Sequence, residues 1–184
     1  MRMLLIFKNS IKLIVTQKSN WCKQSILVMM LFLCSANTYA TTEQSIASLI
    51  ARVESRYNIP KNLLLSIAKV ESGGNTFAIN IEGKPILAKS KEEAINIVQS
   101  YLDQGVINID IGLFQINFHF HGENFADVSE LLDINKNVDY AGSFLSKLYK
   151  THGSWRKAVQ YYHSARAEHH RKYARKVLIA WIAG

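Results

Sequence analysis

Glu71 ends an apolar run in the stretch SIAKVESGGN and is followed by Ser72, Gly73 and Gly74. If the run is a helix, this carboxyl group lies at the helix C-terminus, where free carbonyl groups carry partial negative charge. That position and partial burial both favour the protonated acid. A carboxylic acid that keeps its proton near neutral pH can act as a general acid. On this stretch alone, a solvated surface glutamate remains the alternative.

A second stretch, DIGLFQINFHFHG over residues 110–122, places the amides of Gln115 and Asn117 among apolar side chains. Amides between apolar groups suit a groove in which a polar, uncharged ligand such as a sugar is hydrogen-bonded and stacked. The same composition would also suit a buried turn. Asp110, at the start of the stretch, is the candidate for a second carboxylate near Glu71.

The elements that must position these residues are mostly helices. Apolar residues recur at helical spacing in six segments, residues 45–57, 58–71, 90–105, 135–153, 154–165 and 171–184. Ser90 is the expected N-cap of the third segment, Gly105 and Gly153 are expected helix ends, and Pro60 suits a first helical turn. Residues 75–88 are predicted as strand and turn, with Glu82 and Gly83 at a hairpin tip. The fold class is therefore mainly α (α+β), a single domain of about six helices with a small hairpin.

The first forty residues do not fit that domain. They contain five basic residues and no acidic one, then the apolar run ILVMMLFLC, then SANTYA ending at Ala40. This order predicts a signal peptide over residues 1–40, cleaved after Ala40, and a domain over residues 41–184. The expected location is therefore periplasmic or secreted, with membrane contact only during export. An uncleaved membrane anchor is the alternative.

The leader also changes the charge and cysteine arguments. Five of the 22 Lys and Arg residues lie in it, which leaves 17 against 14 acidic residues, an excess of about +3 instead of the +8 of the whole chain. The case for a nucleic-acid partner is weak at that charge. Cys22 and Cys34 both lie in the leader, so the remaining domain has no disulfide and its stability must come from packing.

Three motifs in order resemble those of the soluble lytic transglycosylase (SLT) domain, a goose-type lysozyme-like fold that cleaves bacterial peptidoglycan. ESGGN at residues 71–75 stands in the place of its Glu-Ser motif, and GLFQIN at residues 112–117 in the place of its Gly-Leu-Met-Gln-Ile motif. YYHSA at residues 161–165, followed by YARKVL, stands where the family has Ala-Tyr-Asn-Ala-Gly and then a Tyr before Lys-Val. The resemblance extends over residues 46–178.

The resemblance implies that Glu71 is the catalytic acid, that Ser72 and Tyr162 orient it, and that Gln115 and Asn117 hold the sugar chain. No metal and no cofactor are implied. Glu71 would protonate the glycosidic oxygen between MurNAc and GlcNAc and then act as base on the C6 hydroxyl of the muramic acid, which closes a 1,6-anhydro ring. A hydrolase needs a second carboxylate across the bond, and Asp110 could supply it.

The sequence departs from the family pattern at two places. Phe114 replaces the usual methionine and should still form an apolar groove floor under a sugar, whereas His163, Ser164 and Ala165 replace Asn-Ala-Gly and change the local loop. Residues 80–110 look like the small members associated with conjugation, type IV secretion and pilus machines. The implied partners are thus peptidoglycan glycan strands and components of such a trans-envelope machine. Alternatives are a muramidase-type hydrolase and a non-catalytic wall-binding component of a secretion apparatus.

Other features favour ordinary roles. His119 and His121 near Glu123 match no helical zinc signature. The basic residues 166–176 are interpreted as a solvated helix face, and Trp155 and Trp181 are predicted to lie in the core.

Overall fold

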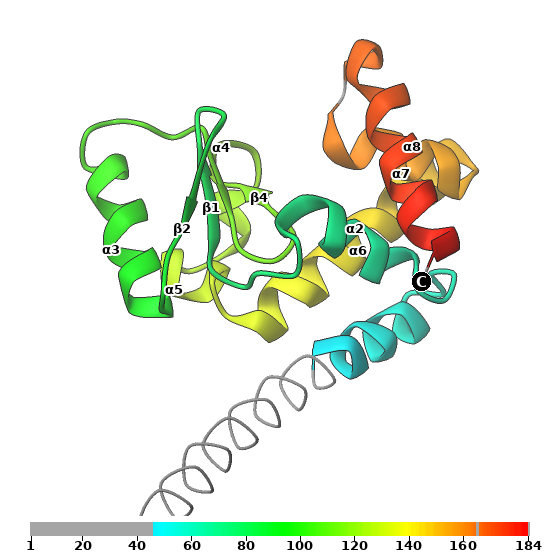
Figure 1. Cartoon of the computed structure of the whole chain (residues 1–184), viewed down its shortest axis with the longest axis horizontal. Coiled ribbons are helices and arrows are strands. Elements are labelled where there is room, and N and C mark those ends of the chain that lie inside the picture. The colour runs from blue at the N-terminus through cyan, green and yellow to red at the C-terminus, as the bar shows by residue number, and fades with distance from the viewer. Residues whose placement is uncertain (1–45, 165, 184) are drawn as a thin grey trace, which may run out of the picture. The chain divides into compact units, whose positions relative to one another are not determined.

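The fold is known from a computed structural model that describes residues 46–164 and 166–183 (Figure 1). A helical stretch over residues 46–56 comes first. The elements that follow are α2 (Leu63–Ser72), β1 (Ala78–Ile81), β2 (Lys84–Leu87), α3 (Lys91–Leu102), β3 (Ile109–Ile111), β4 (Ile116–Asn117), α4 (Phe118–His121), η1 (Gly122–Asn124), α5 (Val128–Leu131), α6 (Ile134–His152), α7 (Trp155–His163) and α8 (Ala167–Ala183). The predicted fold class, mainly α with a small sheet, is confirmed. The predicted signal peptide lies outside the described residues.

The strands form one antiparallel four-stranded sheet in the order β2-β1-β3-β4. Ile81 pairs with Lys84, so Glu82 and Gly83 are the hairpin tip, and their φ angles of 51° and 88° both lie in the left-handed region. Two positive φ values at the central positions are typical of a turn that matches strand twist. The predicted hairpin tip is therefore confirmed, whereas β3 and β4 had not been predicted.

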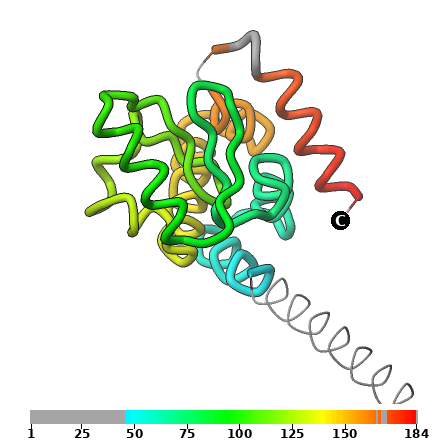
Figure 2. The backbone as a smooth tube through the Cα atoms, turned by 60° about the vertical axis from the view of Figure 1, so that its left-hand side comes forward, coloured from blue at the N-terminus to red at the C-terminus, as the bar shows by residue number. Residues whose placement is uncertain are grey.

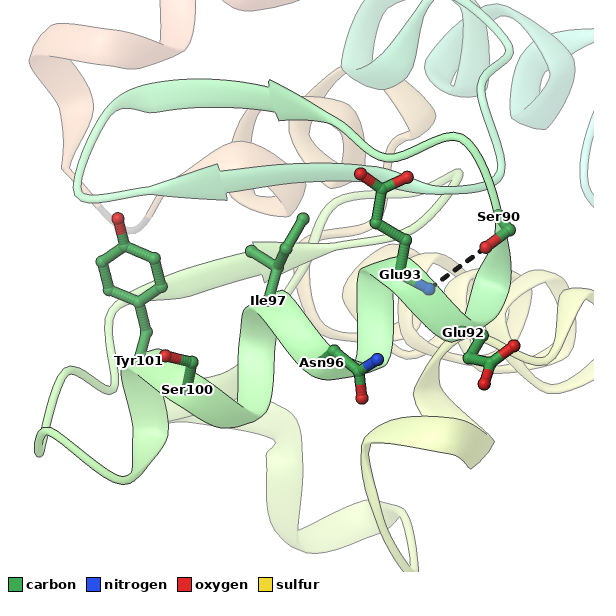
Figure 3. A pocket seen from close by; sticks show the side chains of 7 residues that line it. All are labelled: Ser90, Glu92, Glu93, Asn96, Ile97, Ser100 and Tyr101. Carbon is green, nitrogen blue, oxygen red and sulfur yellow. Dashed lines mark hydrogen bonds between the residues drawn. The ribbon is translucent and has the colours of Figure 1, made fainter.

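Helix α3 begins as its sequence predicts. The hydroxyl of Ser90 accepts a hydrogen bond from the backbone N–H of Glu93, as Figure 3 shows, and the Glu93 carboxylate accepts one from the N–H of Lys89 at 2.7 Å. These reciprocal bonds satisfy one donor of the first helical turn and one donor just before the helix. The hollow in Figure 3 runs along this helix from Ser90 to Tyr101.

Helix α2, which carries Glu71, begins later than predicted. Asn62 has a φ of 65°, so the helix starts at Leu63 and Pro60 lies before its first turn. The donors of that turn are satisfied by Glu54, a carboxylate only 4% exposed that accepts hydrogen bonds from the backbone N–H groups of Asn62, Leu64 and Leu65. A carboxylate suits this position because the helix N-terminus carries partial positive charge.

Helix α8 packs against both α2 and α7, and α7 packs against α6 (Figures 1 and 2). Ile67 of α2 is fully buried, and Tyr173 and Val177 of α8 are buried as well. The C-terminal helix thus lies beside the helix that carries Glu71. In the described part of the chain, no helix is both long and apolar enough to cross a bilayer.

Candidate active site

A cleft of about 830 Å³ opens beside the C-terminal end of α2. The sheet, α4, α6, the end of α7 and the loop after α7 contribute its walls. It is lined by Glu71, Asn80, Asn108, Asp110, Gln115, Ile116, Asn117, His119, Phe120, His121, Tyr140, Phe144, Tyr161, Tyr162, His163, Ser164 and Arg166. The lining combines two part-buried acids with many amide and aromatic side chains, a composition that suits a polar, uncharged ligand.

Glu71 is the penultimate residue of α2 and is partly buried in this cleft. Gly73 follows as the C-cap with a φ of 65° and donates its N–H to the carbonyl oxygen of Lys69. A Cβ atom at Gly73 would meet nothing within 4 Å, so the backbone angle, and not lack of space, accounts for glycine here. The chain can therefore leave the helix directly after the acid.

Burial raises the pKa of Glu71 from its ordinary 4.5 to about 7. The hydrogen bond from Tyr173 opposes this shift, the negative charge of Asp110 adds to it, and the positive charge of Lys176 opposes it. Loss of hydration disfavours the carboxylate more strongly than these partners favour it. A substantial fraction of Glu71 is thus protonated near neutral pH, the state that a general acid needs.

The hydroxyl group that contacts Glu71 belongs to Tyr173 and not to Tyr162. Tyr173 Oη donates to Glu71 Oε1 at 2.5 Å, whereas Tyr162 Oη donates to the carbonyl oxygen of Phe114 at 3.3 Å. The Glu71 charge does contribute to a raised pKa of Tyr162, after burial, so both phenols lie near the acid. The contact with Glu71 that was predicted for Tyr162 is therefore made by Tyr173 of α8.

Ser72 does not hydrogen-bond to Glu71. Its hydroxyl donates to the carbonyl oxygen of Leu113 at 2.8 Å and approaches that of Ala68 at 3.2 Å. The side chain thereby ties the end of α2 to the turn between β3 and β4. It affects Glu71 through the backbone.

Asp110 lies on β3 and lines the same cleft as Glu71. Burial raises its pKa, and the hydrogen bond from Asn117 opposes this shift. Both N–H bonds of the Asn117 amide are in use, to Asp110 at 2.8 Å and to Asn108 at 2.9 Å. Asn117 was expected to hold the sugar, but in this structure its donors hold Asp110 in place.

Gln115 lines the cleft in a left-handed conformation with a φ of 46°. Its amide nitrogen donates to the carbonyl oxygens of Ala78 at 3.1 Å and Gly112 at 2.9 Å. The side chain thus joins the turn to β1. Both bonds use the amide nitrogen and leave the amide oxygen out. That oxygen is the part of Gln115 available to a sugar.

Phe114 does not line the cleft, in contrast to the expectation that it forms the floor under a sugar. Its side chain is 0% exposed, because this turn faces the core of the domain. Its backbone N–H donates to the Oδ1 atom of Asn137 at 3.0 Å, and the Asn137 amide donates to the carbonyl oxygens of Leu131 and Ile111. Phe114 therefore supports the motif from inside the protein.

Aromatic side chains that were not predicted as part of the site also line the cleft. Phe120 is 69% exposed and lines the cleft between His119 and His121. His121 Nδ1 is 2.9 Å from Tyr140 Oη, which fixes the imidazole ring. Among the residues described, no group of three metal-ligating side chains comes together, and these histidines serve as part of the wall.

One polar atom in the cleft wall lacks a partner. Among buried side-chain oxygens and nitrogens of the described residues, Asn80 Oδ1 has no hydrogen-bond partner. Asn80 pairs with Asp110 across β1 and β3 and lines the cleft. An unpaired buried acceptor is costly unless a ligand or water donates to it.

Sequence reasoning missed Tyr173 as the hydrogen-bond partner of Glu71, and it missed Asn80 and Phe120 as cleft residues. Tyr173 was visible as the first residue of YARKVL, but Tyr162 had been given its contact. Asn80 and Phe120 carry no local signal, because only the sheet pairing and the short helix α4 place them in the cleft wall.

An acid with a raised pKa, set among amide and aromatic side chains in a cleft of a mainly α domain with a small sheet, defines an enzyme of the lysozyme-like class. The family model of the transglycosylase SLT domain matches residues 40–177, and the chain belongs to that family. Membership indicates peptidoglycan degradation of the lytic transglycosylase type. Neither the curated proteins nor the solved structures gave a match to the chain.

Proposed function

We propose that this protein cleaves the β-1,4 bond between MurNAc and GlcNAc without water and leaves a 1,6-anhydro-muramoyl end. The observation that carries the proposal is Glu71, held in a cleft with a pKa of about 7, close to the pH at which it must both give and take a proton. A carboxyl group with a matched pKa serves both directions of transfer without a second catalytic group.

The reaction uses the Glu71 carboxyl group twice, first as an acid and then as a base. Glu71 donates its proton to the glycosidic oxygen, the bond from C1 of MurNAc to that oxygen breaks, and the GlcNAc 4-hydroxyl leaves. The Glu71 carboxylate then removes the proton of the MurNAc C6 hydroxyl, whose oxygen bonds to C1. The acid is restored and no water is consumed.

Neighbouring residues have distinct roles in this proposal. Tyr173 positions Glu71 and stabilises its charged form after the first proton transfer. Asn80 Oδ1 accepts a hydrogen bond from the N–H of a sugar acetamido group. Phe120, exposed in the wall, stacks against the apolar face of a sugar ring.

Hydrolysis is the second candidate, and Asp110 is the observation that favours it. This carboxyl group lines the same cleft and its charge raises the pKa of Glu71, so the two acids lie within electrostatic reach of each other. A hydrolase of this fold would use Asp110 to activate water or stabilise the sugar cation. Against this role, burial disfavours the charged form of Asp110 and raises its pKa, and the hydrogen bond from Asn117 offsets this only in part.

Product analysis on purified sacculi in oxygen-18 water separates the candidates. We expect anhydro-terminated, unlabelled muropeptides from the wild type and from Asp110→Asn, and none from Glu71→Gln, which should still bind the wall. Labelled reducing ends that disappear in Asp110→Asn would establish hydrolysis instead. Binding without any release by the wild type would favour a non-catalytic wall-binding component.

The enzyme is proposed to act in the periplasm after removal of residues 1–40 as a signal peptide. The order of basic, apolar and small residues supports this. Protein recovered from the envelope fraction should then begin at Thr41 when its N-terminus is sequenced. Recovery of the full chain in the membrane fraction would support an uncleaved anchor.

The role proposed for this activity is to open the wall locally for a trans-envelope machine. It is supported by the resemblance of residues 80–110 to the small family members associated with conjugation, type IV secretion and pilus machines.

A further inference from the structure

A second cavity of about 410 Å³ lies between the start of α2 and the helices α7 and α8. Among the described residues it shares none with the catalytic cleft. Leu63, Val159 and Val177 are buried and form its apolar base, and Trp155 and Trp181 line it as well. The two tryptophans were predicted to lie in the core, but both are only half-buried.

The tryptophan walls are held in place by contacts outside the cavity. The ring of Trp155 stacks on Tyr149 with centroids 4.1 Å apart and an interplanar angle of 13°. The indole N–H of Trp181 donates to the carbonyl oxygen of Lys61 at 2.8 Å. Because both rings are fixed, an apolar group can enter without first ordering the walls, which favours binding.

Three exposed arginines, Arg156, Arg171 and Arg175, also line the cavity, and no carboxylate is among its described lining residues. The ion pairs found in the described part of the chain, Arg56–Asp139 and Lys136–Glu130, lie elsewhere. Within that part, none of the three guanidinium groups is paired with a carboxylate. Arginine is suited to bidentate recognition of carboxylates at interfaces.

The charged and apolar groups follow one line along α8. Arg171, Arg175, Leu178 and Ile182 recur at helical spacing on one face, and this stripe is about 16 Å long at 1.5 Å per residue. Leu178 is 49% exposed and Ile182 is 78% exposed. A stripe with cations at one end and apolar side chains at the other matches an extended segment better than a single carboxylate with a tail.

We propose that this cavity and stripe are the docking site of an acidic segment of a partner protein. A bulky apolar side chain of that segment enters between Trp155 and Trp181, and neighbouring Asp or Glu residues pair with the arginines. Residues 1–40 of this chain are not the occupant, because they contain no acidic residue and five basic ones. A lipid surface fits less well, because the apolar groups line a recess flanked by cations.

The intrinsic fluorescence of Trp155 and Trp181 can report binding at this cavity. The chain contains Trp21, Trp155 and Trp181, so in the full chain with Trp21→Phe both remaining indoles line this cavity. Titration with the peptide DEFLEDLFED, which contains no tryptophan, should change the fluorescence with saturation. The matched peptide KKFLKKLFKK should cause no such change.

A pair of charge reversals tests where the peptide binds. Arg171→Glu with Arg175→Glu should weaken binding of the acidic peptide by about tenfold or more. The matched control, Lys84→Glu with Lys89→Glu, makes the same charge change at exposed positions in and just after β2 and should leave binding unchanged. Cleavage of sacculi should be retained in both variants.

Three results would overturn the proposal. The first is no saturable change with the acidic peptide, and the second is an equal loss in both double variants, which would indicate a nonspecific charge effect. The third is a response to phosphatidylglycerol vesicles that exceeds the response to the peptide and depends on Arg171 and Arg175, which would assign the surface to a membrane.

Discussion

Glu71 is held in an environment that opposes its ionised form, and the hydrogen bond from Tyr173 only partly offsets this. An acid needed only for stability would be better placed in solvent or at a helix N-terminus. At the end of α2 it has instead a pKa useful for catalysis. The raised pKa of Glu71 should therefore affect both the pH dependence of the free energy of unfolding and the pH dependence of cleavage.

The stability of the protein should fall as Glu71 ionises. Its folded-state pKa of about 7 lies above its ordinary 4.5, so the folded state binds this proton more tightly and the resulting stabilisation is lost as pH rises through 7. Between pH 5 and pH 8 the free energy of unfolding of the wild type should thus fall by roughly 2–3 kcal/mol relative to that of Glu71→Gln. Urea unfolding at both pH values measures this. The exposed Glu92→Gln is the control, and a parallel pH response of wild type and Glu71→Gln would contradict the prediction.

Tyr173→Phe should change the pH dependence of cleavage as well as its rate. The lost hydrogen bond had lowered the pKa of Glu71, so that pKa rises further and the alkaline limb of the pH–rate profile moves to higher pH. The turnover number should fall because the carboxyl group is no longer oriented. Tyr162→Phe is the matched control, since its hydroxyl donates to Phe114 and should leave the limb in place. A shift only in Tyr162→Phe would return the orienting role to that residue.

At the scale of elements, the sequence predicted the helices and strands whose ends are set by local interactions. Examples are the helix start at Ser90, the hairpin tip at Glu82 and Gly83, and the helix end at Gly153, where backbone angles or bonds within a few residues decide the structure. The start of α2 was misjudged, because its capping carboxylate lies in the preceding helix and Asn62 takes a left-handed angle. The strands β3 and β4 have only three and two residues, too few for a period to appear.

The carboxylate of Glu54 caps α2 from the preceding helix, an interaction that the sequence did not predict, and its contribution to stability can be tested. The backbone N–H groups of Asn62 and Leu64 donate to different oxygens of Glu54, so replacing it with Gln removes the charge and places an N–H₂ group against one of these two donors. A buried donor without an acceptor and a lost charge at a helix N-terminus should together cost about 2–4 kcal/mol. Urea unfolding of Glu54→Gln against the exposed Glu123→Gln measures the difference. Equal stability of the two variants would mean that the cap contributes little.

At the scale of the whole domain, the catalytic site depends on parts that are distant in sequence. Glu71 and Tyr173 are 102 residues apart, and Asp110 comes from the sheet between them. Motif order identified Glu71 and the residues 112–117, because those motifs are local. It could not decide which tyrosine reaches Glu71, since that depends on how α8 packs against α2.

The helix over residues 46–56 links packing to this site, because it carries Glu54, which caps α2, and α2 carries Glu71. It lies against α6 at Gly142, where an added Cβ atom would be 2.4 Å from Val53 Cγ1. Gly142→Ala must therefore push the two helices apart and should destabilise the domain by about 1–3 kcal/mol. Activity on sacculi should fall as well, since the cap and α2 shift with the helix.

The second substitution Val53→Ala removes the clashing methyl groups and tests this cause. If the clash is responsible, Gly142→Ala with Val53→Ala should be nearly as stable as Val53→Ala alone, and the double-mutant cycle should show a favourable coupling of about 1 kcal/mol or more. Additive losses would place the effect of Gly142→Ala elsewhere, for instance against Tyr57, which an added Cβ atom would approach to 3.1 Å. Recovery of cleavage together with stability would show that the packing of this distant helix controls the geometry around Glu71.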